Sequence, residues 1–153
     1  KIENKLDLNY VLSKFKNMIF QEYLPGTEYT VDVLSDLTEK PIIAIPRIRL
    51  DTKAGISVKG KIKRDSMIEN LCKKTAETLG IKGPCCIQLK ESKDGELKIL
   101  EVNPRFGGGT IFTTLAGANF PAMLLEMISN NKLIIPKVAD ITVLRYFEEI
   151  IVE

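Results

Sequence analysis

Hydrophobic and polar positions follow two different periods along this chain. Apolar and polar residues alternate through 28–36, which is the pattern of a half-buried β-strand. Segment 67–79 instead spaces its apolar residues three and four positions apart, as one face of a helix does. Asp65-Ser66 offers a cap before that helix, and Gly80 suits the position just past its end. By these criteria we expect helices at 6–17, 67–79, 110–117 and 120–130, strands at 18–24, 28–36, 41–50 and 141–152, and a hairpin at 83–103. Helices combined with a largely antiparallel sheet predict an α+β fold.

The hairpin prediction rests on Asp94-Gly95, a strong signal for a two-residue turn. If these two residues form the turn, Lys93 pairs with Glu96, and regular pairing then places Gln88 opposite Glu101. Directly opposed residues share one face of a sheet. The same register turns four apolar side chains toward a core on the other face, namely Ile87, Leu89, Leu100 and Val102.

The run Glu101-Val102-Asn103-Pro104-Arg105 is the chemically richest part of the chain. Alternate strand residues point to the same face, so Glu101, Asn103 and Arg105 project together if the strand continues. Hard divalent cations take oxygen ligands, and arginine binds phosphate oxygens in a bidentate manner. The pattern therefore suits a metal–polyphosphate complex. The structural alternative is a polar strand end that runs into the loop Phe106-Gly107-Gly108-Gly109.

Together, Gln88 and the run from Glu101 to Arg105 resemble the C-terminal half of the ATP-grasp fold. The likeness is greatest to the branch related to the large subunit of carbamoyl-phosphate synthase, and it extends from about Phe20 to the C-terminus. The resemblance implies a largely antiparallel sheet flanked by helices, with ATP and Mg²⁺, or Mn²⁺ in its place, as cofactors. It also implies metal ligation by Gln88, Glu101 and Asn103, and a catalytic contact from Arg105 to the γ-phosphate or to the acyl phosphate formed from it.

The segment from Ile19 to Leu34 looks like the nucleotide hinge of the same family. The resemblance implies that Glu22, Tyr23 and Leu24 bind the base through backbone groups, that Glu28 accepts hydrogen bonds from the ribose, and that Glu22 assists it. On pattern alone a simple hairpin is the favoured explanation of this stretch, and the downstream run from Glu101 to Arg105 shifts the interpretation to the nucleotide hinge.

Two cations farther along, Arg49 and Lys59, are further candidates, because the family places phosphate- or substrate-facing groups in this region. The alternative is a solvated cationic edge strand, on which such residues discourage pairing with other chains.

Composition excludes several classes of function. A net charge of +2, from 22 basic and 20 acidic residues, gives no case for nucleic acid or anionic membranes as partners. No apolar stretch approaches the roughly 18 residues of a membrane span, and the first residues do not resemble a signal peptide, so we expect a cytoplasmic protein. The chain has no histidine, which removes Ser-His-Asp and Cys-His catalysis. Its three cysteines lack CxxC spacing and are expected to be small buried hydrophobes.

Residues 1–153 are interpreted as the C-terminal part of an ATP-grasp domain cut from a longer protein, since whole enzymes of this kind begin with further domains. The resemblance implies an ATP-dependent carboxylate–amine ligase, or a carbamoyl-phosphate-synthase-like enzyme, that converts a small carboxylic acid to an acyl phosphate and passes it to an amine or ammonia. We expect the isolated piece to be inactive. The alternatives are a non-catalytic nucleotide-binding module and a biotin-dependent carboxylase, which normally has a second Glu where Gln88 stands.

Overall fold

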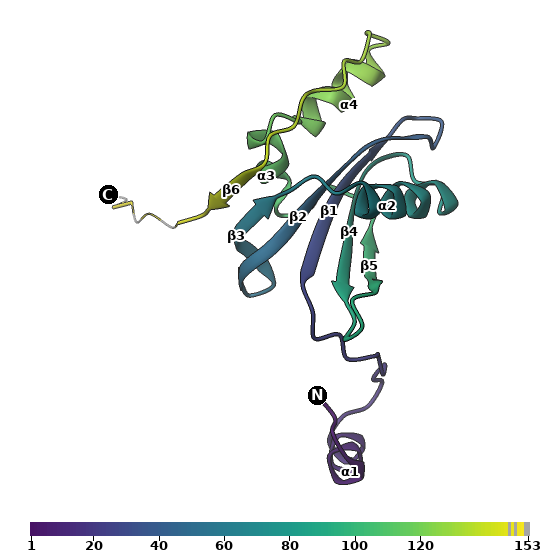
Figure 1. The fold of residues 1–153 in the computed structure, drawn as a ribbon, viewed down its shortest axis with the longest axis vertical. Helices are drawn as coiled ribbons and strands as arrows, with labels where there is room; N and C mark the ends of the chain where they lie inside the picture. The colour runs from purple at the N-terminus through teal and green to yellow at the C-terminus, as the bar shows by residue number, and fades with distance from the viewer. Residues whose placement is uncertain (147, 149, 152–153) are drawn as a thin grey trace.

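A single antiparallel sheet of six strands forms the centre of the molecule, in the order β5-β4-β1-β2-β3-β6 (Figure 1). The computed structural model describes residues 1–146, 148 and 150–151. The strands are β1 (Glu28–Ser35), β2 (Pro41–Lys53), β3 (Ile56–Ile62), β4 (Gly83–Glu91), β5 (Leu97–Asn103) and β6 (Ile141–Leu144). The helices are α1 (Lys5–Lys14), α2 (Ser66–Thr78), α3 (Thr110–Leu115) and α4 (Phe120–Ile128). The α+β prediction is confirmed. None of the helices in the described part of the chain is long and apolar enough to cross a membrane.

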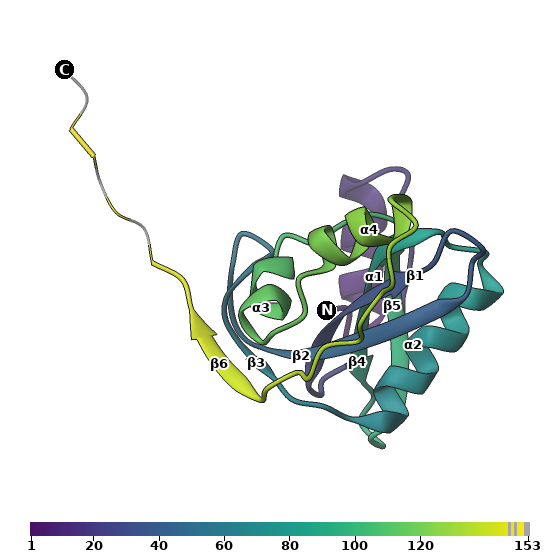
Figure 2. The ribbon, with the colours of Figure 1, turned by 90° about the horizontal axis from the view of Figure 1, so that it is seen from above.

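The two faces of the sheet are covered by different helices (Figure 2). On one face Val31, Val33 and Ile87 belong to a core that also contains the apolar side of α2. On the other face Leu34 and Ile45 pack with residues of α3 and α4. This arrangement follows from the alternation of strand side chains, because neighbouring residues of β1 and β4 point to opposite faces.

Helix α2 begins and ends close to the predicted positions. The Asp65 side chain caps it by accepting hydrogen bonds from the backbone N–H groups of Met67 and Ile68. Gly80 follows its last turn with φ +62°, a conformation that glycine adopts without steric cost. Asp65 and Gly80 therefore mark the start and the end of α2, as predicted.

The strand predicted at 18–24 is wrong, because this stretch contains no strand. Strand β1 already pairs with β2 on one side and β4 on the other, so the sheet offers the incoming segment no free edge beside it. Instead, Gly26 N–H donates to the Glu91 carbonyl at 3.0 Å, which fixes the chain just before β1. Helix α1 lies apart from the sheet, at the bottom of Figure 1, and buries none of its residues.

The last predicted strand, 141–152, is shorter in the structure, where β6 ends at Leu144. Part of the predicted range, at 147, 149 and 152, lies outside the described residues. Strand β6 pairs with β3 at one edge of the sheet. It therefore brings the chain near its C-terminus next to the strands that surround the candidate site.

The β4–β5 hairpin departs twice from the predicted regular pairing. Its loop has three residues, Lys93-Asp94-Gly95, because Ser92 N–H donates to the Glu96 carbonyl at 2.8 Å, so the predicted two-residue turn is wrong. A bulge in β5 then shifts the register between Gln88 and Leu89. The two irregularities offset each other, and Gln88 lies opposite Glu101 as predicted.

The bulge also changes which residues of β5 face α2. Leu97 and Val102 pack against the core beneath α2. Ile99, rather than the predicted Leu100, lines the groove between β5 and that helix. Residues 97 and 99 would point away from residue 102 in a regular strand. The extra residue at the bulge shifts the alternation by one, so Leu97, Ile99 and Val102 lie on the same face.

Candidate functional site

A cavity of about 250 Å³ lies on the same sheet face as α3 and α4, beyond the part that these helices cover. Strands β1, β2, β4 and β5 form its base, and the turn between β2 and β3 and the segment after β5 form its sides. Its lining residues are Thr30, Arg47, Arg49, Gly55, Ile56, Ser57, Cys86, Gln88, Asn103, Arg105, Gly107, Gly108 and Gly109.

Arg49 lies at the centre of the polar contacts on this face. Its Nη1 atom lies 2.6 Å from Glu28 Oε1 and donates to Gln88 Oε1 at 2.9 Å. Its Nη2 atom donates to the Gly55 carbonyl at 2.7 Å, which ties the β2–β3 turn to the site. Strand β2 lies inside the sheet and the Arg49 side chain is only 7% exposed, so the alternative of a solvated edge is wrong for this residue.

Glu101 accepts hydrogen bonds from the two other proposed metal ligands. Gln88 Nε2 donates to Glu101 Oε1 across the hairpin, and Asn103 Nδ2 donates to the same oxygen at 2.9 Å. Arg105 follows, with its Nη2 atom 3.5 Å from Asn103 Oδ1 and its Nη1 atom bonded to the Phe106 carbonyl. One connected set of side chains therefore contains Glu28, Arg49, Gln88, Glu101, Asn103 and Arg105.

Glu28 and Glu101 do not line the cavity themselves but contact Arg49 and Gln88, which do. Four further predicted binding residues lie away from the cavity. Lys59 is an exposed residue of β3. Glu22 and Tyr23 are exposed in the segment before β1, where they line a shallow pocket beside α1, and Leu24 is buried. The predicted base-binding segment ends at Leu24, and Pro25-Gly26-Thr27 then leads to Glu28 at the start of β1.

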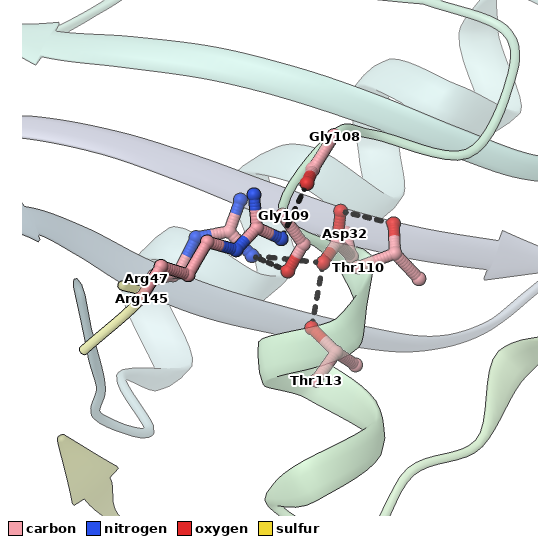
Figure 3. Close-up of polar contacts among 7 residues, drawn as sticks. All are labelled: Asp32, Arg47, Gly108, Gly109, Thr110, Thr113 and Arg145. Carbon is pink, nitrogen blue, oxygen red and sulfur yellow. Dashed lines mark hydrogen bonds and ion pairs between the residues drawn. The ribbon is translucent and has the colours of Figure 1, made fainter. Parts of the chain in front are cut away.

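Sequence reasoning missed a buried polar cluster around Asp32, shown in Figure 3. Asp32 is 1% exposed and accepts hydrogen bonds from Thr113 Oγ1 at 2.6 Å, Arg47 Nη1 at 3.1 Å and Thr110 Oγ1 at 3.3 Å. A buried charge is costly unless it is paired and hydrogen-bonded, and this carboxylate has both kinds of partner. The available signal was an acidic residue between two valines, Asp32, and a basic residue at the end of the apolar run of β2, Arg47.

Two arginines hold consecutive carbonyl groups of the glycine loop, residues 107–109 (Figure 3). Arg47 donates to the Gly109 carbonyl at 2.8 Å, and Arg145 donates to the Gly108 carbonyl at 2.7 Å. Both guanidinium groups lie over the Phe112 ring, with centroid distances of 5.3 and 4.9 Å. A Cβ atom at Gly109 would collide with the Arg47 guanidinium, so any larger residue here would displace the Arg47 side chain from its buried contacts.

We expect Arg145→Met to loosen the glycine loop while leaving the sheet intact. Methionine keeps apolar contact with Phe112 but cannot donate to Gly108. Amide hydrogen exchange should become faster in residues 107–112, with little change in β3 and a small change in Tm. Leu144→Ala, an exposed position on the same segment, serves as the control. Equal exchange in both variants would contradict the role given to the Arg145 guanidinium.

The cysteines are buried free thiols, as predicted. Cys86 borders the cavity, and burial, assisted by the nearby Asp32 carboxylate, raises its pKa to about 11. The thiol therefore stays protonated at neutral pH and is a poor nucleophile.

The side-chain oxygens at this site favour a metal ion that is bound partly by the protein and partly by the phosphates of a substrate. Within the described residues, no three His, Cys, Asp or Glu side chains are grouped so that they could hold a metal ion. Gln88, Glu101 and Asn103 provide side-chain oxygens with a single carboxylate among them. Mg²⁺ commonly binds through one or two carboxylates together with substrate phosphates, and this set fits that arrangement.

The family model described as "ATP-grasp in the biosynthetic pathway with Ter operon" matches residues 14–150. The chain belongs to the ATP-grasp family. No curated protein sequence matches it.

Solved structures share the ATP-grasp fold at low sequence identity. An L-amino acid ligase from Bacillus licheniformis is 16% identical, with a TM-score of 0.58 over 82% of this chain. The phosphoribosylaminoimidazole carboxylase ATPase subunit from Aquifex aeolicus is 20% identical, with a TM-score of 0.59 over 74% of this chain. A biotin carboxylase–β,γ-ATP complex from Campylobacter jejuni is 14% identical, with a TM-score of 0.61 over 77% of this chain. The ATP-grasp chain described here spans 35%, 37% and 29% of these three chains, respectively.

Proposed function

We propose that this chain is the ATP- and Mg²⁺-binding half of an ATP-dependent carboxylate–amine ligase that works through an acyl phosphate. The observation that carries the proposal is the connected set Gln88, Glu101, Asn103 and Arg105 beside an arginine-lined cavity. Membership of the ATP-grasp family supports ATP as the co-substrate. The likeness to the carbamoyl-phosphate synthase branch, with ammonia or an amine as acceptor, is part of this proposal.

In the proposed site, Gln88, Glu101 and Asn103 hold Mg²⁺, or Mn²⁺ in its place, through their side-chain oxygens. The bound ion would offset negative charge on the ATP phosphates. The hydrogen bonds from Gln88 and Asn103 to Glu101 hold these three side chains together before any ligand arrives. A preorganised set of ligands reduces the free energy needed to assemble the site.

Arg105 is the proposed catalytic residue. It follows Asn103 by two positions, and its guanidinium group lies next to the Asn103 side chain and borders the cavity. A guanidinium group matches phosphate oxygens in a bidentate manner and would stabilise charge that develops as the γ-phosphoryl group moves to the substrate carboxylate. The amine or ammonia then displaces phosphate from the acyl phosphate, so no protein nucleophile is needed.

Nucleotide binding is assigned to Glu28, Arg49 and the segment Glu22-Tyr23-Leu24, with Lys59 as an outlying candidate. Arg49 Nη1 contacts both Glu28 Oε1 and Gln88 Oε1, which are the oxygens proposed for the ribose and for the metal. When the nucleotide and metal engage these oxygens, the Arg49 guanidinium becomes free to contact phosphate. We propose that further domains of a longer protein complete the nucleotide site, since this chain spans only 29–37% of the similar ATP-grasp chains.

The proposed function is tested by measuring ADP and phosphate release by the complete protein. ATP, Mg²⁺, a panel of small carboxylic acids and ammonia or amines are supplied together and then omitted one at a time. Release should require the acid and the divalent cation, and the ligated product should appear in equal amount. Nucleotide binding without acid-dependent ADP release across the panel would instead support a non-catalytic nucleotide-binding module.

Glu28→Ala is expected to raise the KM for ATP by about tenfold and to change kcat much less. Contacts to the ribose act alike in the ground and transition states, so their loss weakens binding without slowing the chemical step. Steady-state kinetics over a range of ATP concentrations measures both constants, and Glu39→Ala, in the exposed β1–β2 turn, is the control. A fall in kcat at unchanged KM would contradict the ribose assignment.

A further inference from the structure

The charge on the cavity wall is one-sided. Three arginines line the cavity, Arg47, Arg49 and Arg105, and no aspartate or glutamate of the described chain does so. The nearby carboxylates are already engaged: Asp32 pairs with Arg47, Glu28 pairs with Arg49, and Glu101, the proposed metal ligand, accepts hydrogen bonds from Gln88 and Asn103. A surface of this kind attracts anions, and apart from the metal position assigned to Glu101 it offers a cationic group no carboxylate that is not already paired with an arginine.

Several donors on this wall remain without a partner. Arg47 is 1% exposed, and its Nε atom, like that of Arg49, is buried and has no hydrogen-bond partner among the described residues. Buried donors are rarely left unpaired, so two of them in neighbouring arginines of β2 call for an explanation. A ligand that draws the guanidinium groups toward the cavity would provide acceptors for them.

Two hydroxyl groups add to this donor set. Thr30 and Ser57 line the cavity and are 5% and 6% exposed, respectively. No hydrogen bond within the described residues engages either hydroxyl oxygen. Each hydroxyl can therefore donate to an acceptor placed in the cavity.

We infer that this cavity binds the acid to be activated, and that the acid carries a second anionic group and no ammonium group. The inference rests on the proposed ligase function and specifies its substrate class as a small dicarboxylic or similarly dianionic acid. The reacting carboxylate lies near Arg105, and the second anionic group contacts the donors of Thr30, Arg47 and Ser57. An α-amino acid is disfavoured, because burying its ammonium group among arginines without a carboxylate partner is costly.

The inference can be tested without ATP by NMR titration of the 153-residue chain. Succinate, butyrate and 4-aminobutyrate share a four-carbon backbone and differ in the group at one end, which is anionic, apolar or cationic. Succinate should give saturable shifts of the backbone amide signals of Ser57 and the glycine loop. Butyrate should bind at least tenfold more weakly, and 4-aminobutyrate more weakly still.

Thr30→Val and Ser57→Ala each remove one hydroxyl with little change in shape. Each should weaken succinate binding about three- to tenfold, because a net hydrogen bond contributes that much. Thr142→Val on β6, outside the cavity, is the control. The amide spectra of the variants show whether the fold is preserved, and having two independent variants guards against one that fails to fold.

Any one of three outcomes would overturn the inference that the cavity binds a dianionic acid. These outcomes are an absence of saturable shifts with succinate, equal binding of 4-aminobutyrate, or unchanged succinate affinity in both hydroxyl variants. Because no nucleotide is present, such a result leaves acid-dependent ADP release unaffected as the test of the ligase proposal. Conversely, succinate binding without ATP-dependent turnover would support the anion site and contradict the ligase.

Discussion

Replacing Asp32 with alanine is expected to lower the free energy of unfolding by about 3–5 kcal/mol, the range for breaking a buried ion pair by removing one partner. The variant leaves Arg47 charged, buried and without its carboxylate, and it removes the acceptor of Thr113. For a domain of this size the corresponding fall in Tm is about 6–20 °C. The loss should be larger than that of any single surface substitution.

Urea denaturation followed by circular dichroism measures this effect. Asp51→Ala, an exposed aspartate on β2, is the matched control and should unfold close to the wild-type midpoint. In the double variant Asp32→Ala/Arg47→Met both charges are gone, so part of the stability should return. Equal midpoints for Asp32→Ala and Asp51→Ala would show that the buried pair does not stabilise the fold.

Glu101→Ala is expected to lower kcat of the complete protein by about 10²–10⁴-fold, because a metal ion supplies several kcal/mol of charge stabilisation and Glu101 is the only carboxylate among its proposed ligands. The Tm should change little, since Glu101 is exposed. ADP release at saturating ATP and acid measures the loss. Glu96→Ala, an exposed residue of the same hairpin, should keep wild-type turnover. Near-normal turnover in Glu101→Ala would remove the metal assignment.

Much of the candidate site followed from local rules of strand geometry. Glu101 and Asn103 were predicted to project together because they alternate along one strand, and their side chains contact each other in the structure. The strand ends at Asn103, so Arg105 reaches the Asn103 side chain from the bend after β5 and not as the next alternate strand residue. The pairing of Gln88 with Glu101 was also correct. It was reached through a two-residue turn that does not form, since the longer loop and the β5 bulge offset each other. The Asp94-Gly95 pair signalled a turn but did not reveal its length.

The parts that could not be predicted depend on contacts between residues far apart in the chain. Asp32 bonds Thr113 across 81 positions, and Arg145 bonds Gly108 across 37. Such contacts depend on how α3 and β6 dock on the sheet, and no local pattern specifies that docking. The strand predicted at 18–24 failed for a related reason, because an apolar run forms a strand only where a sheet edge is free to accept it.

The strands that carry the base of the candidate site on one face carry hydrophobic core residues on the opposite face, and this has a consequence for directed evolution. Base residues such as Thr30 and Gln88 alternate with core residues such as Val31 and Ile87, so substitutions there disturb activity and folding together. The turn at 53–56 borders the same cavity from a solvent-exposed loop. Libraries that aim to change acid preference should therefore yield more soluble, altered variants when they randomise this turn than when they randomise the strands.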